Sequence, residues 1–534
     1  MTRRNFSPSL FTVLILLVTA LIASGCRSAD NLSNENPIHT SPMLDRSETD
    51  HDVSVYVVNP EENFNTESYK VFDENPFILA AQIGLSTFSA DVNTASYANI
   101  RRYLNASKLP PKDAVRVEEM INYFRYDYET PEADQTFAVK MQISDTPWNA
   151  ETKLLHIAMQ THAHEVENEE PNNLVFLIDV SGSMNAPEKL DLVKRTFISL
   201  LEELENQDRI SIVTYAGSDQ VVLDGATAYE KVEIMDAIEN LTAQGSTHGS
   251  AGIKKAYEIA RKHFIPGGNN RILLATDGDL NVGISSEGEL KQLIEKEKES
   301  GVFLSVLGFG QGNLKDDKLQ TLAYNGNGIY HYIDTIHEAR KVLFEEIGQN
   351  LLTVAKDVKL QVDFNPYYIK GYRLIGYENS LMADEDFRDD SKDGGELGSG
   401  HQIAVLYELV SEDSSYEIPH ADSKYKNEKN SGIENNELLQ LNIRYKDPHE
   451  DTSEELNIPL SSEDWTNSTN LEDGNTVLAA NIAAFGMLLR DSEYIGEYTY
   501  ENIYNALQEL NTDNSYVKEL MELVLKTNAL HNAQ

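Results

Sequence analysis

The sequence contains a single cysteine in 534 residues, so no disulfide can form within the chain. Basic residues are also scarce: 44 Lys and Arg stand against 87 Asp and Glu, a formal net charge of 44 − 87 = −43. Such a surface repels phosphate backbones, which argues against nucleic acid as a partner. The carboxylate excess favours divalent cations and basic partners, although a merely soluble acidic surface explains the same composition.

Signatures of catalysis are missing as well. The chain has no His-Glu-x-x-His, no Gly-x-Ser-x-Gly and no phosphate-binding glycine loop, the patterns that mark zinc proteases, serine hydrolases and nucleotide-binding loops. A metal-dependent hydrolase is therefore the weakest alternative, and we expect a protein that binds rather than catalyses.

The longest apolar run, Leu10 to Ile22, is too short to span a bilayer comfortably and follows the basic residues Arg3 and Arg4. This pattern predicts a signal peptide over residues 1–25. It ends in Ala23-Ser24-Gly25-Cys26, which resembles a lipobox, although Ala23 stands where Leu is usual. The resemblance implies that Cys26 becomes the acylated first residue of an envelope lipoprotein, whereas a free structural cysteine is the other interpretation.

Arg27 follows the cysteine at the position where an inner-membrane retention signal has Asp. By the same resemblance we expect the outer membrane in a bacterium with two membranes. Residues 26–70 are rich in Asn, Ser, Glu and Asp and have few apolar positions. They cannot bury enough surface to offset the entropy of ordering, which predicts a lipidated flexible stalk.

The remaining chain is long enough for several domains. We expect an N-terminal α+β module over 71–170, an α/β domain over 171–350, a β-rich, sandwich-like domain over 351–465 and a helical region over 466–534. Helical spacing marks 94–104 and 115–124 near the start and 477–489, 500–510 and 516–525 near the end. Strand patterns mark 137–144 and 154–160, then 358–364, 372–377, 403–409 and 438–445.

Between residues 173 and 350, strands alternate with helices. The strands are predicted at 174–178, 209–215, 271–276, 302–308 and 329–333, and an amphipathic helix runs from Leu190 to Leu204. Alternation of this kind yields a mainly parallel sheet with helices on both faces, a Rossmann-like doubly wound fold. Because strand patterns flank this domain on both sides, we also expect it to be inserted into a β-sandwich, with residues 137–160 pairing with strands after residue 357.

Polar side chains follow two of the predicted strands. The strand at 174–178 continues into Asp179-Val180-Ser181-Gly182-Ser183, and the strand at 271–276 continues into Asp277. The carboxyl ends of parallel strands share one edge of a sheet, where open sheets bind ligands. Two carboxylates brought together there need a cation, and a hard divalent ion also accepts serine hydroxyls as ligands.

These segments resemble the metal-ion-dependent adhesion site of von Willebrand factor type A domains, which combines Asp-x-Ser-x-Ser, a loop threonine and a later aspartate. The threonine corresponds to Thr247 in Gln244-Gly245-Ser246-Thr247. The resemblance implies one bound divalent cation, held by Asp179, Ser181, Ser183, Thr247 and Asp277. Magnesium is the expected ion, with calcium or manganese as alternatives. A coordination position left open would accept an acidic residue of a protein ligand.

A second resemblance covers roughly residues 75 to 530. The segment from Ser86 to Asn99, the segment from Pro110 to Phe124 and the stretch from Gly395 to His401 are similar to bacterial YfbK-type A-domain lipoproteins. The leading hypothesis is therefore an envelope-anchored protein that recruits a protein ligand through its metal ion. An assembly factor for an AAA ATPase of the MoxR type is an alternative, but an exported chain has no access to ATP.

Overall fold

The computed structural model describes residues 65–90, 93–163, 171–202, 204–205, 207–245, 249–278, 287–298, 300–346, 352–420, 432–448, 450, 452–466 and 471–533. Residues 63–534 form one compact unit. Within it we distinguish the central domain, residues 172–345, from the flanking module, which is built from the chain before and after that domain. No helix among the described residues is long and apolar enough to cross a bilayer.

The central domain has a six-stranded sheet in the order β10-β9-β8-β5-β6-β7. Its strands are β5 (Asn172–Asp179), β6 (Arg209–Tyr215), β7 (Asp219–Thr227), β8 (Asn269–Thr276), β9 (Phe303–Phe309) and β10 (Tyr330–Ile333). All neighbouring pairs are parallel except the edge pair of β6 and β7. The helices are α3 (Leu190–Leu200), α4 (Lys231–Glu239), α5 (Gly249–Lys262), α6 (Glu287–Lys298), α7 (Asp316–Asn325) and α8 (Ile336–Arg340).

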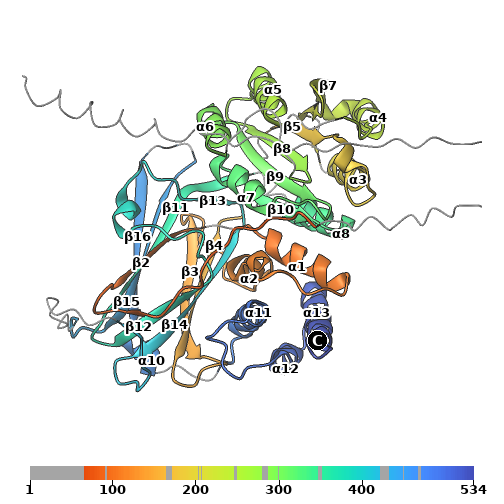
Figure 1. Cartoon of the computed structure of the whole chain (residues 1–534). Helices are drawn as coiled ribbons and strands as arrows, with labels where there is room; N and C mark the ends of the chain where they lie inside the picture. Colours follow the sequence, from red (N-terminus) through yellow and green to blue (C-terminus); the bar gives the residue numbers. More distant parts are fainter. Residues whose placement is uncertain are drawn as a thin grey trace, which may run out of the picture. The chain divides into compact units, whose positions relative to one another are not determined.

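Both faces of this sheet are buried, because the inner strands β5, β8 and β9 carry apolar side chains on both faces rather than on one. Along β5, Phe176 faces a core shared with α3, α4 and α8, whereas Leu177 faces a core shared with α5, α6 and α7. Figure 1 shows the two helix layers on either side of the sheet. The expected doubly wound fold is confirmed.

The flanking module contains two more sheets. One has the order β1-β12-β14-β4-β3; the other has the order β13-β11-β15-β16, with β2 beside β11. The strands before the central domain are β1 (Ile78–Leu79), β2 (Leu85–Ser89), β3 (Phe137–Asp145) and β4 (Lys153–Thr161). Those after it are β11 (Thr353–Phe364), β12 (Ile369–Ile375), β13 (Gly395–Gly398), β14 (Gln402–Ser411), β15 (Glu437–Lys446) and β16 (Ser453–Ser461).

Strands from the two halves of the chain lie next to each other in both sheets. β4 pairs antiparallel with β14, with Ile157 opposite Val405, and β2 pairs antiparallel with β11, with Phe88 opposite Leu360. These side chains share one core between the sheets. The pairing of residues 137–160 with strands after 357 is therefore confirmed, and the central domain is an insertion into a sandwich.

The other face of the β4–β14 sheet is covered by helices. They are α1 (Ala95–Asn105) and α2 (Val117–Asn122) from the first half, with α11 (Gly474–Arg490), α12 (Tyr500–Glu509) and α13 (Ser515–His531) from the C-terminal region. Leu154 and Leu406 of the sheet belong to the same core as these helices. In Figure 1 the C-terminal helices, in blue, lie beside α1 and α2, in orange. The helical end of the chain thus completes the flanking module.

Buried ion pairs join the central domain to the flanking module, and we call them the charged interface. Arg116, just before α2, contacts Glu119 at 2.5 Å and Asp316 of α7 at 2.6 Å. Arg101 of α1 contacts Asp334 and Glu338 of the central domain at 2.5 and 2.7 Å. Arginine can hold two carboxylates at once because its planar group carries five N–H donors.

Candidate metal centre

The two predicted carboxylates lie at one edge of the central sheet. Asp179 is the last residue of β5 and Asp277 directly follows β8, and these strands are parallel neighbours with Ile178 opposite Ala275. Both aspartate side chains are fully buried. Their closeness follows from the sheet: strands that are apolar on both faces must lie inside, and their ends deliver the polar residues to a common rim.

Asp179 is held entirely by neutral donors. Its Oδ1 accepts the backbone N–H of Ser181 at 2.9 Å. Its Oδ2 accepts the hydroxyl groups of Thr276 at 3.0 Å and Tyr215 at 3.2 Å. Burial and the nearby charge of Asp277 raise the pKa of Asp179 to about 6. An added positive charge would therefore stabilise this carboxylate.

Asp277 has a cation of its own. Lys189 Nζ lies 3.0 Å from its Oδ2, and Asn313 Nδ2 donates to the same oxygen at 2.9 Å. Lys189 also donates to Asn313 Oδ1 at 2.7 Å. Burial alone would raise the pKa of Asp277, but the Lys189 charge and hydrogen bonds from Asn313, Lys189 and Ser183 outweigh it and lower the pKa.

The serines bridge the two carboxylates. The hydroxyl oxygens of Ser181 and Ser183 lie 3.0 Å apart, and Ser183 is hydrogen-bonded to Asp277. Ser181 is buried, whereas Ser183 is exposed to solvent. A continuous run of oxygen donors thus leads from the buried carboxylates to the surface.

Two predicted residues, Thr247 and Cys26, lie outside the described residues. The chain just before Thr247 does reach the site: Gly182 N–H donates to Gly245 O at 3.0 Å, and Gln244 N–H donates to Val180 O at 2.7 Å. Asp179, Ser181, Ser183 and Asp277 are brought together.

Sequence reasoning missed the partners of the two aspartates: Lys189, Tyr215, Thr276 and Asn313. Thr276 could have been found, because it directly precedes Asp277 at the end of a strand. Lys189 and Asn313 carry no such signal, since they come from separate loops that meet only in the fold. Gly310, in the left-handed region at φ +77°, leaves the room that the Lys189 side chain occupies, because a methyl group there would clash with it.

Asn313 is positioned by the first described residues of the chain, which we call the N-terminal strap (residues 65–70). Its backbone forms a parallel bridge to the loop over 310–315: Thr66 N–H donates to Gly312 O at 2.8 Å and Ser68 N–H donates to Leu314 O at 3.0 Å. The Glu67 carboxylate accepts Gly312 N–H at 2.6 Å and pairs with Arg102 at 2.9 Å. The last residues of the predicted stalk are thus bound to the central domain.

The donor set suits a hard cation. It consists of carboxylate and hydroxyl oxygens, the groups that magnesium, calcium and manganese prefer. Among the described residues no three His, Cys, Asp or Glu side chains form a metal cluster, but a set of two aspartates with hydroxyl groups does not need one. The residues present therefore fit a divalent ion held by Asp179, Ser181, Ser183 and Asp277.

Family models match three parts of the chain: "von Willebrand factor" at residues 63–156, "von Willebrand factor type A domain" at 173–345 and "Uncharacterized protein YfbK, C-terminal" at 349–530. Uncharacterized protein YfbK of Escherichia coli (strain K12) is 40% identical over 480 residues, which cover 88% of this chain and 82% of that protein. The human inter-alpha-trypsin inhibitor heavy chain H3 is 28% identical over 194 residues, 34% of this chain and 22% of that protein.

Solved structures show weaker likeness. A von Willebrand factor type A protein from Catenulispora acidiphila has a TM-score of 0.42 at 15% identity, covering 73% of this chain and 89% of that one. BatB from Bacteroides thetaiotaomicron has a TM-score of 0.28 at 23% identity, covering 33% of this chain and 96% of that one. These likenesses are too partial to add to the family matches.

Proposed function

Because the chain belongs to the YfbK family and carries a von Willebrand factor type A domain, we propose that it is a metal-dependent protein-binding lipoprotein of the cell envelope. The domain by itself implies a role in protein interaction in general terms. The finer proposal is that one divalent cation, magnesium first, binds at Asp179, Ser181, Ser183, Thr247 and Asp277. The bound ion then accepts an acidic side chain of a protein ligand, and no catalysis is involved.

The observation that carries this proposal is that the two aspartates have different charge and hydrogen-bond partners. Lys189 pairs with Asp277 at 3.0 Å, whereas Asp179 has only neutral donors and a pKa raised to about 6. With both carboxylates ionised, the local charge is −2 + 1 = −1. A dication changes it to +1. The loaded site would therefore attract a carboxylate, and the exposed Ser183 marks the side from which it approaches.

The proposed anchor is the acylated Cys26, at the outer membrane of a bacterium with two membranes. An acidic protein gains nothing from anionic lipid headgroups, so attachment would depend on the acyl chains, at about 0.8 kcal/mol for each buried methylene. Mass spectrometry of the protein extracted from its host would show lipid-modified Cys26. An unmodified N-terminus that retains residues 1–25 would contradict the anchor.

The metal is tested by calorimetric titration of the mature chain with Mg²⁺, followed by Ca²⁺ and Mn²⁺. We expect one ion per chain in the native protein and none in Asp179→Ala or Asp277→Ala. Asp191→Ala is the matched control, because it removes an exposed carboxylate from the same domain. Near-ultraviolet circular dichroism establishes that each variant is folded. The absence of binding for all three ions, or equal binding by the Asp179 variant, would overturn the proposal.

A further inference from the structure

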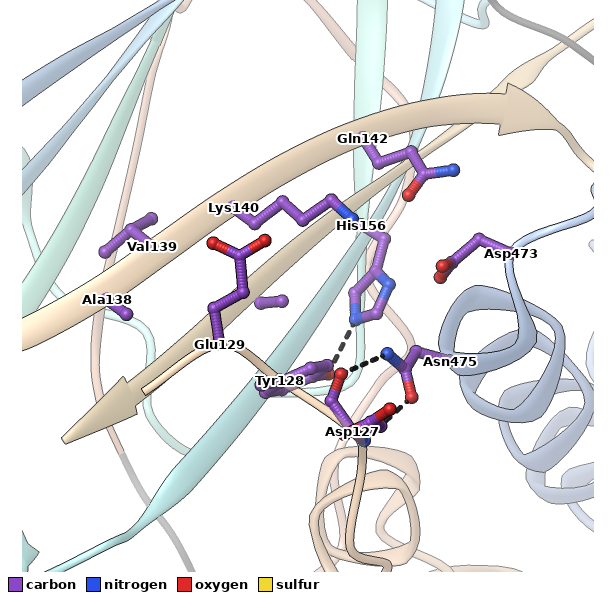
Figure 2. Close-up of a pocket in the computed structure, with 11 residues that line it drawn as sticks. Asp127, Tyr128, Glu129, Ala138, Val139, Lys140, Gln142, His156, Asp473 and Asn475 are labelled. Atoms are coloured by element: carbon purple, nitrogen blue, oxygen red, sulfur yellow. Dashed lines mark hydrogen bonds between the residues drawn. The ribbon is translucent and has the colours of Figure 1, made fainter. Parts of the chain in front are cut away.

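A cavity of about 190 Å³ opens on the flanking module, and none of the residues that line it belongs to the central domain with its candidate metal centre. It lies between β3, β4, the loop before β3 and the first turn of α11, so both halves of the split module contribute to it (Figure 2). The side chains that matter are Tyr128, Glu129, Lys140, Gln142, His156 and Asp473. We call it the β3–α11 cavity.

One wall of the cavity is a hydrogen-bond chain with a fixed direction. Thr476 donates its hydroxyl proton to Asp473 Oδ2 at 2.9 Å, so its oxygen must accept from His156 Nδ1–H, also at 2.9 Å. His156 Nε2 then carries no proton and accepts the hydroxyl of Tyr128 at 2.9 Å. Both ring nitrogens are thereby used within the wall, and neither is left for a ligand.

The imidazole in this wall stays neutral at physiological pH. Burial lowers the pKa of His156 to about 4, so the imidazole is uncharged, and its ring is only 3% exposed. The stacked rings of Tyr126 and Tyr128, 5.0 Å apart, support it from behind. The cavity therefore has an uncharged floor of aromatic and imidazole surface.

The mouth of the cavity carries charges of both signs. Lys140 and Glu129 are exposed, and within the described part of the chain neither forms an ion pair or a side-chain hydrogen bond. By contrast Lys153, on the neighbouring strand, pairs with Asp145 at 2.6 Å. Opposite charges that line one cavity without pairing with each other are available to the two ends of a dipolar ligand.

The size of the cavity limits that ligand. An engineered cavity of about 150 Å³ in another protein holds benzene, so about 190 Å³ accommodates a molecule of six to ten heavy atoms. We propose that the β3–α11 cavity binds a small zwitterion, a free amino acid or a dipeptide. Lys140 takes its carboxylate, Glu129 takes its ammonium group, and the floor accepts a short side chain. This site is independent of the metal ion.

The test is calorimetric titration of the mature chain at pH 7 with L-alanine and glycylglycine. Acetate and ethylamine, which carry one charge each, are the matched ligands. We expect at least one of the two zwitterions to bind with a Kd of about 1 mM or tighter. Acetate and ethylamine should bind at least about tenfold more weakly. Whichever of the two zwitterions binds more tightly shows whether the site takes a free amino acid or a dipeptide. No binding of either zwitterion up to about 10 mM, or equal binding of acetate, would overturn the proposal.

Variants locate the site. Lys140→Met and Glu129→Gln alter exposed side chains without partners in the described structure, so both proteins should fold normally. Each should weaken zwitterion binding at least about tenfold, the loss expected for one charged contact. Lys153→Met, on the adjacent strand but outside the cavity, is the control and should bind as the native protein does. Unchanged binding in both cavity variants would contradict the assignment.

Discussion

The Arg116 site of the charged interface and the candidate metal centre each bury two carboxylates beside one cation, but the cation contacts both carboxylates only in the first. At the interface, Arg116 contacts both Glu119 and Asp316, all three being at most 2% exposed. At the candidate metal centre, Lys189 pairs with Asp277 but not with Asp179, whose carboxylate accepts hydrogen bonds from neutral donors. The guanidinium group of Arg116 pairs with both carboxylates of the first site. The ammonium group of Lys189 pairs with one carboxylate of the second site, so a further cation can still bind the other.

The largest expected effect comes from breaking the closed site. Arg116→Met leaves two buried carboxylates without their cation, which should lower the free energy of unfolding by about 3–5 kcal/mol. Urea denaturation measures the change. Lys112→Met is the control, because Lys112 pairs with Asp491 on the surface, where the side chains are 60% and 58% exposed. It should cost no more than about 1 kcal/mol. Equal effects in the two variants would refute the structural role of Arg116.

Arg116→Lys sharpens the comparison, because it gives the interface the cation type of the metal centre. A lysine can pair with Glu119 or Asp316 but cannot form the fork that holds both. We expect a loss of stability between those of Arg116→Met and Lys112→Met. A lysine variant as stable as the native protein would mean that the geometry of the guanidinium is not what closes this site.

Acidification should stabilise the folded protein through Asp179 of the candidate metal centre and destabilise it through His156 of the flanking module. The folded-state pKa of Asp179 is raised to about 6, so protonation stabilises the folded protein, and this gain is lost as pH rises through 6. The pKa of His156 is lowered to about 4, so the unfolded chain binds the proton first, and stability is lost as pH falls from about 6.5 to 4. Each shift corresponds to about 3 kcal/mol.

The measurement is urea denaturation between pH 7 and pH 4 in EDTA. Relative to the native protein, Asp179→Asn should lose about 3 kcal/mol more on acidification, because it lacks the stabilising protonation. His156→Gln should lose about 3 kcal/mol less. If the free energy of unfolding changed with pH in the same way for all three proteins, the pKa of neither Asp179 nor His156 would be shifted as stated here.

The smallest expected effect is on ion affinity. Lys189→Met removes the positive charge 3.0 Å from Asp277 and leaves both carboxylates to the added ion. Mg²⁺ should then bind about tenfold more tightly in calorimetric titration. Lys194→Met, on the helix α3 that directly follows Lys189, removes a side chain bonded to Glu239 O and should leave the affinity unchanged. Weaker binding in the Lys189 variant would mean that Lys189 acts chiefly by positioning Asp277.

Local pattern predicted much of this structure. The alternation of apolar strands and helices predicted the doubly wound sheet, and the polar residues after β5 and β8 predicted which side chains share its edge. The strand β7 was missed because Asp219–Thr227 is partly polar and reads as a surface loop. Strand patterns on both flanks predicted the inserted sandwich, but not that α11 packs against α2, since helical spacing specifies a buried face without its partner.

The candidate site was predictable where it depends on strand ends and unpredictable where it depends on loops. Asp179 and Asp277 belong to the first kind. Lys189 and Asn313 belong to the second, because their meeting requires the paths of two loops and of the strap. His156 is buried, and its place in a directed hydrogen-bond chain comes from Tyr128 and Thr476, which lie far from it in the sequence.

The N-terminal strap has a mechanical consequence. A pull on the chain ahead of residue 65 is divided at Glu67 between the loop over 310–315, which the strap holds through Thr66, Glu67 and Ser68, and α1, which it holds through Arg102. That loop carries Asn313, which holds Asp277 at 2.9 Å. With the proposed lipid anchor and protein ligand, tension between the two would therefore be shared between the loop beside the candidate metal centre and α1 of the flanking module.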